Sequence, residues 1–300
     1  MNPLSRRSAL GLIGSGVAAS VVAPSIALAA KQGMRLSLAA YSFREHFAVM
    51  KGKARTAASP EMDMFKFLDF CAQHDCQGAE LTSYFFPADA DAKYFRKIRK
   101  HGEAKGVAIS GTAVGNNFSL EPGAERDAQS AYVREWIDNA VMMGAPHVRI
   151  FAGKKKKETS EERADQLVIE ALRDICKYAA KKKVKLGLEN HDSIATAERL
   201  IRLLKAVDSE WLGVNLDSGN FRTADPYKDF ELSAPHAVNV QIKTKLKIGD
   251  TSEAVDSDLP RFIALLKKAD YRGWVALEFE EKDNPYEACP PVLKQLAGLL

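Results

Sequence analysis

Two apolar runs in the middle of the chain end in the same way, and they restrict the fold more than any other feature. Residues 185–192 (KLGLENHD) and residues 212–220 (LGVNLDSGN) each read as a short buried strand that stops at acidic and polar groups. In parallel α/β proteins the carboxyl ends of the strands converge on the ligand. Taken singly, Glu189 fits a helix cap and Asp217 fits a turn. The repetition favours a site at the strand ends.

The same alternation of a short apolar segment with an amphipathic helix extends through the chain. Strands are predicted at residues 34–44, 77–83, 107–113, 144–153, 184–188, 212–216, 238–243 and 274–280. Helices are predicted at residues 61–74, 91–105, 124–143, 160–183, 196–207, 259–269 and 286–300. Eight such units predict an α/β fold, a single-domain (β/α)8 TIM barrel over residues 31–300. A doubly wound sheet is disfavoured because no Gly-x-Gly-x-x-Gly turn follows an early strand.

The segment after the first predicted strand and the four cysteines give two further predictions. Residues 45–60 lack periodicity and are expected to form a long first loop, a candidate lid. The four cysteines form no Cys-x-x-Cys pair, and we expect them to be buried and unbridged.

The amino terminus has the pattern of an export signal. Arg6 and Arg7 precede an uncharged run over residues 9–30 that closes in Ala-Leu-Ala at residues 27–29. This predicts a twin-arginine signal peptide at residues 1–30, a periplasmic location and no stable membrane insertion after cleavage. An uncleaved anchor is the less favoured alternative, because the run is poor in large apolar residues. Loss of the two arginines lowers the net charge from +4 to +2, which does not favour nucleic acid as a partner.

If the barrel closes, the last strands present four oxygen-bearing side chains around one mouth: Glu189, Asp217, Gln241 and Glu278. Carboxylates crowded in a low-dielectric funnel repel one another, and a divalent cation commonly relieves that repulsion. Oxygen ligands favour Mn²⁺ or Mg²⁺, with Zn²⁺ or Co²⁺ as further possibilities. His191, two residues after Glu189, is a candidate ligand or substrate contact.

The chain resembles the xylose isomerase-like TIM-barrel superfamily, which includes sugar phosphate isomerases and epimerases. The resemblance rests on residues 41–44 (YSFR), 189–191 (ENH), 217–220 (DSGN), 241–243 (QIK) and 274–278 (WVALE). In that family's ketose epimerases a divalent ion is held by Glu, Asp, His and Glu on strands five to eight. The resemblance places these ligands at Glu189, Asp217, Gln241 and Glu278. Gln241 departs from the family pattern, which has histidine there, followed two positions on by the lysine that is Lys243 here.

The resemblance implies proton abstraction next to a sugar carbonyl, with formation of an enediolate. Glu189 and Glu278 are the candidate acid and base, and Asp217 is a ligand. Candidate contacts to the sugar are His191, Lys243, Arg149, Glu80 and Arg44. Arg149 has the alternative role of a salt bridge with Glu80, and Glu80 is equally well explained as a structural residue.

The leading hypothesis is an exported, metal-dependent sugar isomerase or epimerase, with an oligomer as an open possibility. A phosphorylated substrate is less expected, because no Gly-rich phosphate loop is visible. One alternative is a lyase or hydrolase of 3-keto-glycosides, and another is a sugar-binding barrel without turnover, which Gln241 motivates. Endonuclease activity is least favoured, since three zinc ions need more histidine than a chain with six supplies.

Overall fold

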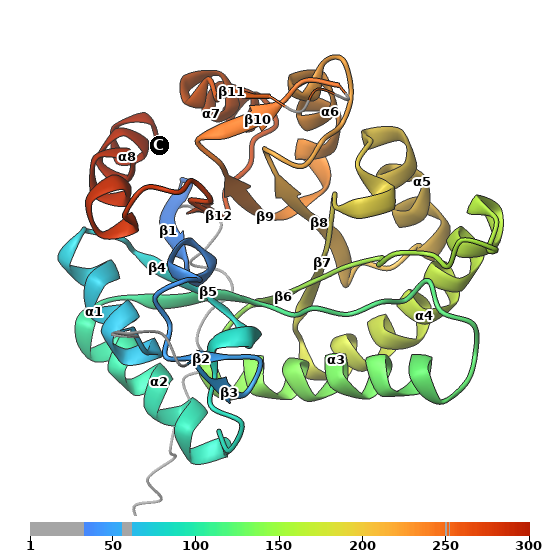
Figure 1. The fold of residues 1–300 in the computed structure, drawn as a ribbon, viewed down its shortest axis with the longest axis horizontal. Helices are drawn as coiled ribbons and strands as arrows, with labels where there is room; N and C mark the ends of the chain where they lie inside the picture. Colours follow the sequence, from blue (N-terminus) through green and yellow to red (C-terminus); the bar gives the residue numbers. More distant parts are fainter. Residues whose placement is uncertain (1–32, 56–61, 250, 252) are drawn as a thin grey trace, which may run out of the picture. The chain divides into compact units, whose positions relative to one another are not determined.

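Eight parallel strands close into a barrel whose neighbours follow the order of the chain (Figure 1). The computed structural model describes residues 33–55, 62–249, 251 and 253–300. The strands are β1 (Arg35–Ala39), β4 (Gly78–Thr82), β5 (Ala108–Ala113), β6 (His147–Ile150), β7 (Lys185–Glu189), β8 (Leu212–Asp217), β9 (Ala237–Ile242) and β12 (Trp274–Leu277). β12 pairs with β1 and closes the ring. The predicted (β/α)8 barrel is confirmed.

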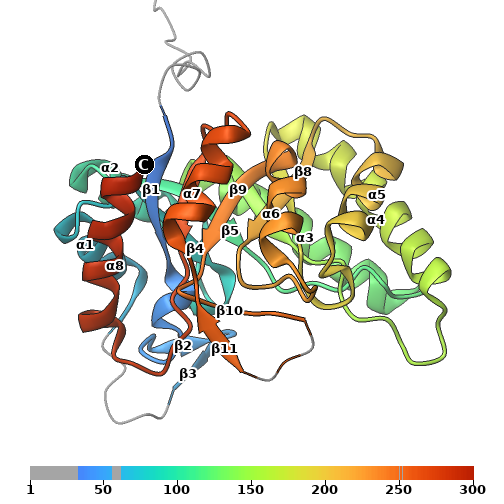
Figure 2. The same ribbon diagram turned by 90° about the horizontal axis from the view of Figure 1, so that it is seen from above.

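Helices follow the strands and cover the outside of the ring (Figures 1 and 2). They are α1 (Met64–Gln73), α2 (Ala92–Lys105), α3 (Ala124–Met143), α4 (Glu161–Lys182), α5 (Ala197–Val207), α6 (Pro226–Ser233), α7 (Leu259–Lys268) and α8 (Pro285–Leu299). Most begin at a side chain that accepts a hydrogen bond from a first-turn amide, as Ser160 does for α4 and Thr196 for α5. α6 was not predicted, because eight residues that begin with proline carry too little periodicity.

Strand register determines which side chains meet inside the ring. Glu189 on β7 pairs with Asn215 on β8, and Asp217 pairs with Gln241 on β9. The register shifts between Val214 and Asn215, and it also shifts between residues 79 and 80 at the β4–β5 edge. Irregularities of this kind re-aim the side chains that follow. Both precede a polar residue of the site described below.

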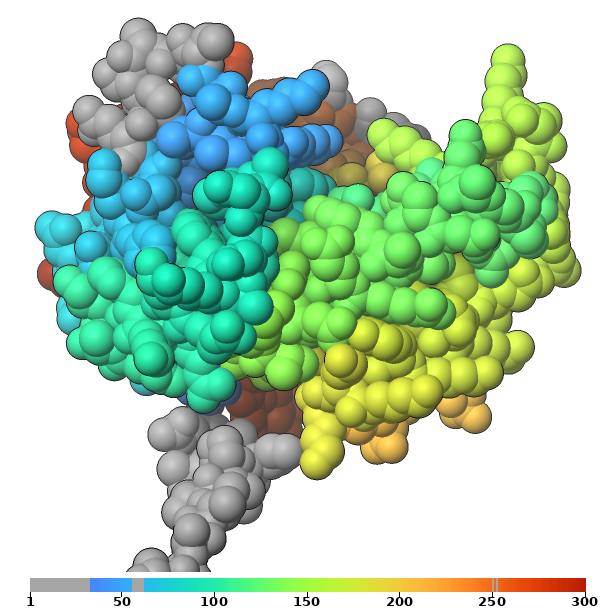
Figure 3. Space-filling model, turned by 90° about the horizontal axis from the view of Figure 1, so that it is seen from below, coloured from blue at the N-terminus to red at the C-terminus, as the bar shows by residue number. Residues whose placement is uncertain are grey.

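Two small hairpins lie at the end of the barrel where the strands finish (Figure 2). One pairs β2 (Val49–Met50) with β3 (Lys53–Ala54), and the other pairs β10 (Lys245–Lys247) with β11 (Ala254–Asp256). The first hairpin lies in the segment predicted as a loop, residues 45–60, of which the structure describes residues 45–55. Its turn is fixed to the barrel, because the amide of Lys51 donates to the carbonyl of Tyr84 at 2.6 Å. On one face of the molecule this segment borders the residues after β4 (Figure 3).

Three further expectations concern the chain as a whole. The four cysteines, Cys71, Cys76, Cys176 and Cys289, are all buried and free. Among the described residues no helix has both the length and the apolar character that a membrane span requires. The predicted signal peptide, residues 1–30, lies outside the described residues.

Candidate active site

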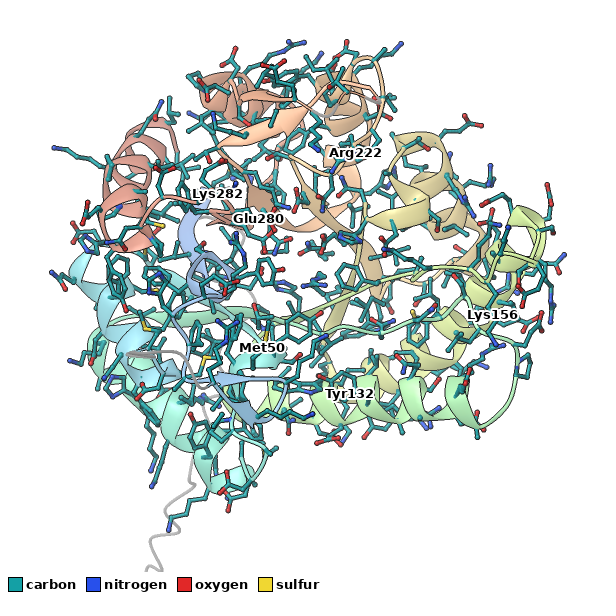
Figure 4. The ribbon with its side chains drawn as sticks, viewed as in Figure 1. Met50, Tyr132, Lys156, Arg222, Glu280 and Lys282 are labelled. Carbon is teal, nitrogen blue, oxygen red and sulfur yellow. The ribbon has the colours of Figure 1, made fainter. Side chains whose placement is uncertain are left out.

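A cavity of about 280 Å³ opens at the carboxyl ends of the strands. Five of the predicted site residues line it: Arg149, Glu189, His191, Lys243 and Glu278. The rest of the lining consists of Tyr41, Met50, Lys51, Tyr84, Phe151 and Glu280. Figure 4 labels Glu280, which follows β12, and Met50, which lies on β2. The strand ends and the first hairpin therefore enclose one polar cavity.

Glu189 ends β7 and is neutralised by a buried arginine. Its Oε2 lies 2.9 Å from Nε of Arg149, and both side chains are about one-twentieth exposed. Its Oε1 accepts a hydrogen bond from Nδ2 of Asn220 at 2.8 Å. Burial raises the pKa of Glu189, and the guanidinium of Arg149 opposes that rise. The predicted salt bridge of Arg149 exists, with Glu189 as its partner rather than Glu80.

Lys243 follows β9 and carries its ammonium into a cluster of acids. Its Nζ lies 3.0 Å from Oδ2 of Asp217, 3.4 Å from Oε2 of Glu278 and 2.9 Å from Oε2 of Glu280. It also donates to Oδ1 of Asn220 at 3.2 Å. Burial alone would lower the pKa of this amine, but the surrounding carboxylates outweigh it and hold the pKa well above its ordinary value. Lys243 is therefore a buried amine whose charged form is favoured by the acids around it.

The turn at residues 217–220 is built around this lysine. Ser218 Oγ accepts from the backbone amide of Lys243 at 2.8 Å. Gly219 leaves room for the stem, because a Cβ at this position would lie 2.7 Å from Cδ of Lys243. Asp217 and Asn220 contact the ammonium at the other end. The four residues of this motif therefore surround the backbone amide, the stem and the ammonium of one lysine.

Gln241 donates toward the acids and turns its oxygen away from them. Its Nε2 donates to Oε1 of Glu80 at 2.6 Å and to Oε1 of Glu278 at 3.2 Å. Its Oε1 accepts from Nδ2 of Asn215 at 2.5 Å. The opposite orientation would set the amide oxygen against two carboxylates and two NH₂ groups against each other. The neighbouring residues therefore determine which end of the amide faces the mouth.

Below the mouth lies a second set of polar residues, which we name the amide layer: Glu80, His147, Asn215, Asn239 and Gln241. Asn215 and Asn239 stand two residues before Asp217 and Gln241 on their strands and so share their face. Asn239 donates to Glu80 at 2.6 Å and to Asn215 at 2.7 Å. Burial raises the pKa of Glu80 to about 7 and lowers that of His147 to about 4. Glu80 is fully buried and does not line the cavity, so its position supports the structural interpretation over substrate contact.

The remaining predicted contacts occupy different positions. His191 lies beyond the end of β7, packs on the ring of Phe151 at 4.6 Å between centroids and lines the cavity. Arg44 does not line it. The guanidinium of Arg44 donates to the carbonyls of Phe279 and Glu280 at 3.1 and 2.8 Å, so it supports the segment after β12.

The four predicted metal ligands do not fit a metal ion as they are arranged. Each oxygen of Glu189, Asp217, Gln241 and Glu278 lies within 3.4 Å of a donor group. The partners are Arg149 and Asn220, Gly219 and Lys243, Asn215, and Gln241 and Lys243 respectively. Oδ2 of Asp217 forms an ion pair with Lys243 but accepts no hydrogen bond from the residues that the structure describes. Within the described part of the chain, no three His, Cys, Asp or Glu side chains gather in a group that could hold an ion. The ligand roles implied by the resemblance therefore gain no support here.

Several site residues were missed or given no role from the sequence. Asn220 was part of a recognised motif, yet nothing in its spacing shows that it bridges Glu189 and Lys243. Glu280 ends a predicted strand and received no role of its own, yet its carboxylate pairs with Lys243. Tyr84 and Lys51 reach the cavity from the segment after β4 and the first hairpin, two parts of the chain whose contact has no signature in the sequence.

The barrel is similar to solved structures of low sequence identity. L-ribulose 3-epimerase matches with a TM-score of 0.68 and 15% identity, over 88% of this chain and 92% of that one. The 3-keto-D-glucoside 4-epimerase from E. coli matches with a TM-score of 0.65 and 15% identity, over 88% and 99%. IOLI protein with a binding zinc atom matches with a TM-score of 0.69 and 14% identity, over 89% and 96%.

Sequence comparison identifies the family more directly than these folds do. No curated protein matches the chain. A family model, described as the xylose isomerase-like TIM barrel, matches residues 68–296, which is most of the chain and includes every cavity-lining residue from Tyr84 onward. The chain therefore belongs to the xylose isomerase-like TIM barrel family.

Proposed function

We propose that the protein is a sugar isomerase or epimerase that transfers a proton at a carbon next to a carbonyl. The observation that carries the proposal is that Glu189 and Glu278, from strands on different sides of the mouth, line one cavity together with Arg149 and Lys243. Two acid–base groups and two cations are what an enediolate intermediate needs. The similar folds of two epimerases support the same class of reaction.

The chemistry follows from these four side chains. One carboxylate takes the proton, the C–H electron pair forms the C=C bond, and the carbonyl oxygen becomes an enolate. Lys243 or Arg149 stabilises that oxygen by charge. In an epimerase the second carboxyl group returns a proton to the opposite face of the same carbon. In an isomerase a carboxyl group gives the proton to the former carbonyl carbon, while the proton of the neighbouring hydroxyl group moves to the former carbonyl oxygen. Burial raises the pKa of Glu189, and that of Glu278 well above its ordinary value, which brings both nearer to the pH at which they must exchange protons.

The test is uptake of solvent deuterium. The protein is incubated in deuterated buffer with free ketoses and with 3-keto-glycosides, and exchange at carbon is followed by NMR. We expect exchange with at least one sugar, and a loss of about 10²–10⁴-fold in Glu278→Gln and Glu189→Gln. Sugars that bind to the protein without any exchange would contradict catalysis and favour the non-catalytic sugar-binding barrel.

A second reaction has its own structural support. A cavity of about 390 Å³ shares Lys51 and Tyr84 with the first and is also lined by Tyr132, which Figure 4 labels on α3, and by Trp136. A glycoside has a substituent that this space would accept, whereas a free ketose does not. Release of the aglycone from a 3-keto-glycoside, measured beside deuterium uptake, would indicate a lyase or hydrolase.

We also propose that residues 1–30 direct export through the twin-arginine pathway. Arg6 and Arg7 and the uncharged run after them support it. Replacement of both arginines by lysine should leave the full-length protein in the cytoplasm of the producing cell, whereas the natural sequence should yield a shortened periplasmic form. Equal distribution of both proteins would contradict the proposal.

A further inference from the structure

Lys243 stands among the acids where a bound cation would otherwise be needed. The ammonium contacts oxygens of Asp217, Asn220, Glu278 and Glu280 within 3.4 Å. Lys243 is 8% exposed and Asp217 is fully buried. Acids crowded in such surroundings require a compensating positive charge, and here a side chain supplies it.

The turn at residues 217–220 fixes this lysine along its whole length. It holds the backbone amide, the stem and the ammonium through Ser218, Gly219 and Asn220 in turn. A lysine held in this way cannot leave the acids without breaking several buried hydrogen bonds, each of which would leave an unpaired polar group. The arrangement is a built site for an ammonium.

The lysine alone would not separate this protein from metal-binding relatives, since the family resemblance includes it. Gln241 makes the difference. Its oxygen accepts from Asn215 and its NH₂ group faces Glu80 and Glu278, so it presents donors where the resemblance places a histidine ligand. The second buried cation, Arg149, pairs with Glu189 in the same way, with its Nε 2.9 Å from Oε2 of the glutamate.

We propose that Lys243 replaces the divalent ion at this site, so that the protein neither binds nor needs a metal. Gln241 is the residue that excludes the ion, because its amide points NH₂ toward the acids. Lys243 is then the group that stabilises the enolate oxygen, and this part of the proposal rests on the proposed function. The statement that the site binds no metal does not depend on the proposed function.

The first test uses the unaltered protein. Metal content after purification is measured by mass spectrometry, and binding of Mn²⁺, Zn²⁺ and Mg²⁺ is measured by calorimetry. We expect less than about 0.1 equivalent of metal, no shift of the unfolding midpoint with 1 mM Mn²⁺ and unchanged deuterium exchange after treatment with EDTA. About one equivalent of bound metal, or a micromolar Kd, would overturn the proposal.

The second test creates the missing ligand. The double variant Gln241→His with Lys243→Met removes the ammonium and adds a ring nitrogen beside three carboxylates. We expect it to bind Zn²⁺ or Mn²⁺ at least tenfold more tightly than the unaltered protein and to unfold at a higher temperature with the ion than without it. If it gains no affinity, the role assigned to Gln241 and Lys243 is wrong.

Two controls keep these outcomes distinct. Lys245→Met removes a nearby lysine that pairs with the exposed Asp256, and it should change neither metal affinity nor exchange. The single variant Gln241→His retains Lys243 and serves if the double variant does not fold. Its metal affinity should lie between that of the unaltered protein and that of the double variant. If it binds metal as tightly as the double variant while Lys243 is still present, the proposal is contradicted. Absence of exchange with every sugar, both with and without added metal, would reject the proposed function and leave the metal-binding result standing. Exchange that disappears with EDTA and returns with added metal would overturn the metal proposal.

Discussion

The barrel interior contains two polar regions that stabilise buried carboxyl groups in different ways. At the mouth, Glu189, Asp217 and Glu278 are buried beside the cations Arg149 and Lys243. In the amide layer below, Glu80 is equally buried but receives its hydrogen bonds from neutral amides only. Burial raises the pKa of Glu189, Glu278 and Glu80 alike. Ion pairs with Arg149 and Lys243 oppose that rise at the mouth, whereas the charge of Arg149 and hydrogen bonds from amides oppose it at Glu80. The mouth is therefore arranged for charge, and the layer beneath it for position.

The largest effect should come from removal of the mouth's arginine. Arg149→Leu leaves Glu189 buried without its partner, and we expect a loss of about 3–5 kcal/mol in the free energy of unfolding, measured by urea denaturation at pH 7. Arg99→Leu is the matched control, because Arg99 lies 2.8 Å from Glu103 while both side chains are about half exposed. It should cost less than about 1 kcal/mol. Equal losses would mean that burial does not distinguish the two pairs.

Glu80 in the amide layer should make the stability of the protein depend on pH between about 4.5 and 7. The folded protein keeps the proton of Glu80 up to about pH 7, whereas the unfolded chain releases it near 4.5. The folded state therefore binds the extra proton in this range, and stability falls as pH rises through it. Glu80→Gln removes this titration. The free energy of unfolding of the variant should therefore rise relative to that of the unaltered protein by up to about 3 kcal/mol between pH 4.5 and 7.

The quantity to measure is how the difference in free energy of unfolding between Glu80→Gln and the unaltered protein changes with pH. Its absolute size is less informative, because loss of the carboxylate also adds a contribution that does not depend on pH. His147→Gln provides the opposite sign. The pKa of His147 falls to about 4, below its ordinary value of 6.5, so its burial adds stability as pH rises between those values. The difference between this variant and the unaltered protein should fall as pH rises. A flat difference for Glu80→Gln would show that Glu80 is ionised in the folded protein.

The contrast between the two regions also explains how far the sequence was informative. Strand periodicity and acids at strand ends predicted the barrel and placed Glu189 and Glu278 at one cavity, and the family resemblance added Lys243. Periodicity reports which side chains face inward, but it does not report which end of the Gln241 amide faces the acids. That orientation depends on Asn215 and Glu80, and Glu80 lies 161 positions from Gln241 in the sequence. The metal prediction rested on the carboxylates of the mouth and on the family resemblance, and neither includes the hydrogen-bond partners that the amide layer supplies to Gln241.

Close packing in the amide layer should produce an intermediate effect. Gly111 on β5 lies under the ring of His147, and a Cβ there would lie 1.9 Å from Cε1 of that ring. Gly111→Ala must displace a fully buried imidazole, so we expect a loss of about 1–3 kcal/mol in thermal or urea unfolding. Gly298→Ala in α8 is the control, because the same atom meets nothing within 4 Å. It should stabilise the helix slightly.

The smallest effect separates exposure from distance within the mouth itself. Asp217 and Glu280 lie 3.0 and 2.9 Å from the same ammonium, but the Asp217 side chain is fully buried and that of Glu280 is 39% exposed. Solvent screens Glu280, so Glu280→Gln should lower the free energy of unfolding by less than about 1 kcal/mol, and 1 M salt should remove that difference. Asp217→Asn should cost several times more and should be insensitive to salt. If the two variants behaved alike, the charge of Lys243 would be balanced by the cluster as a whole and not by its buried members.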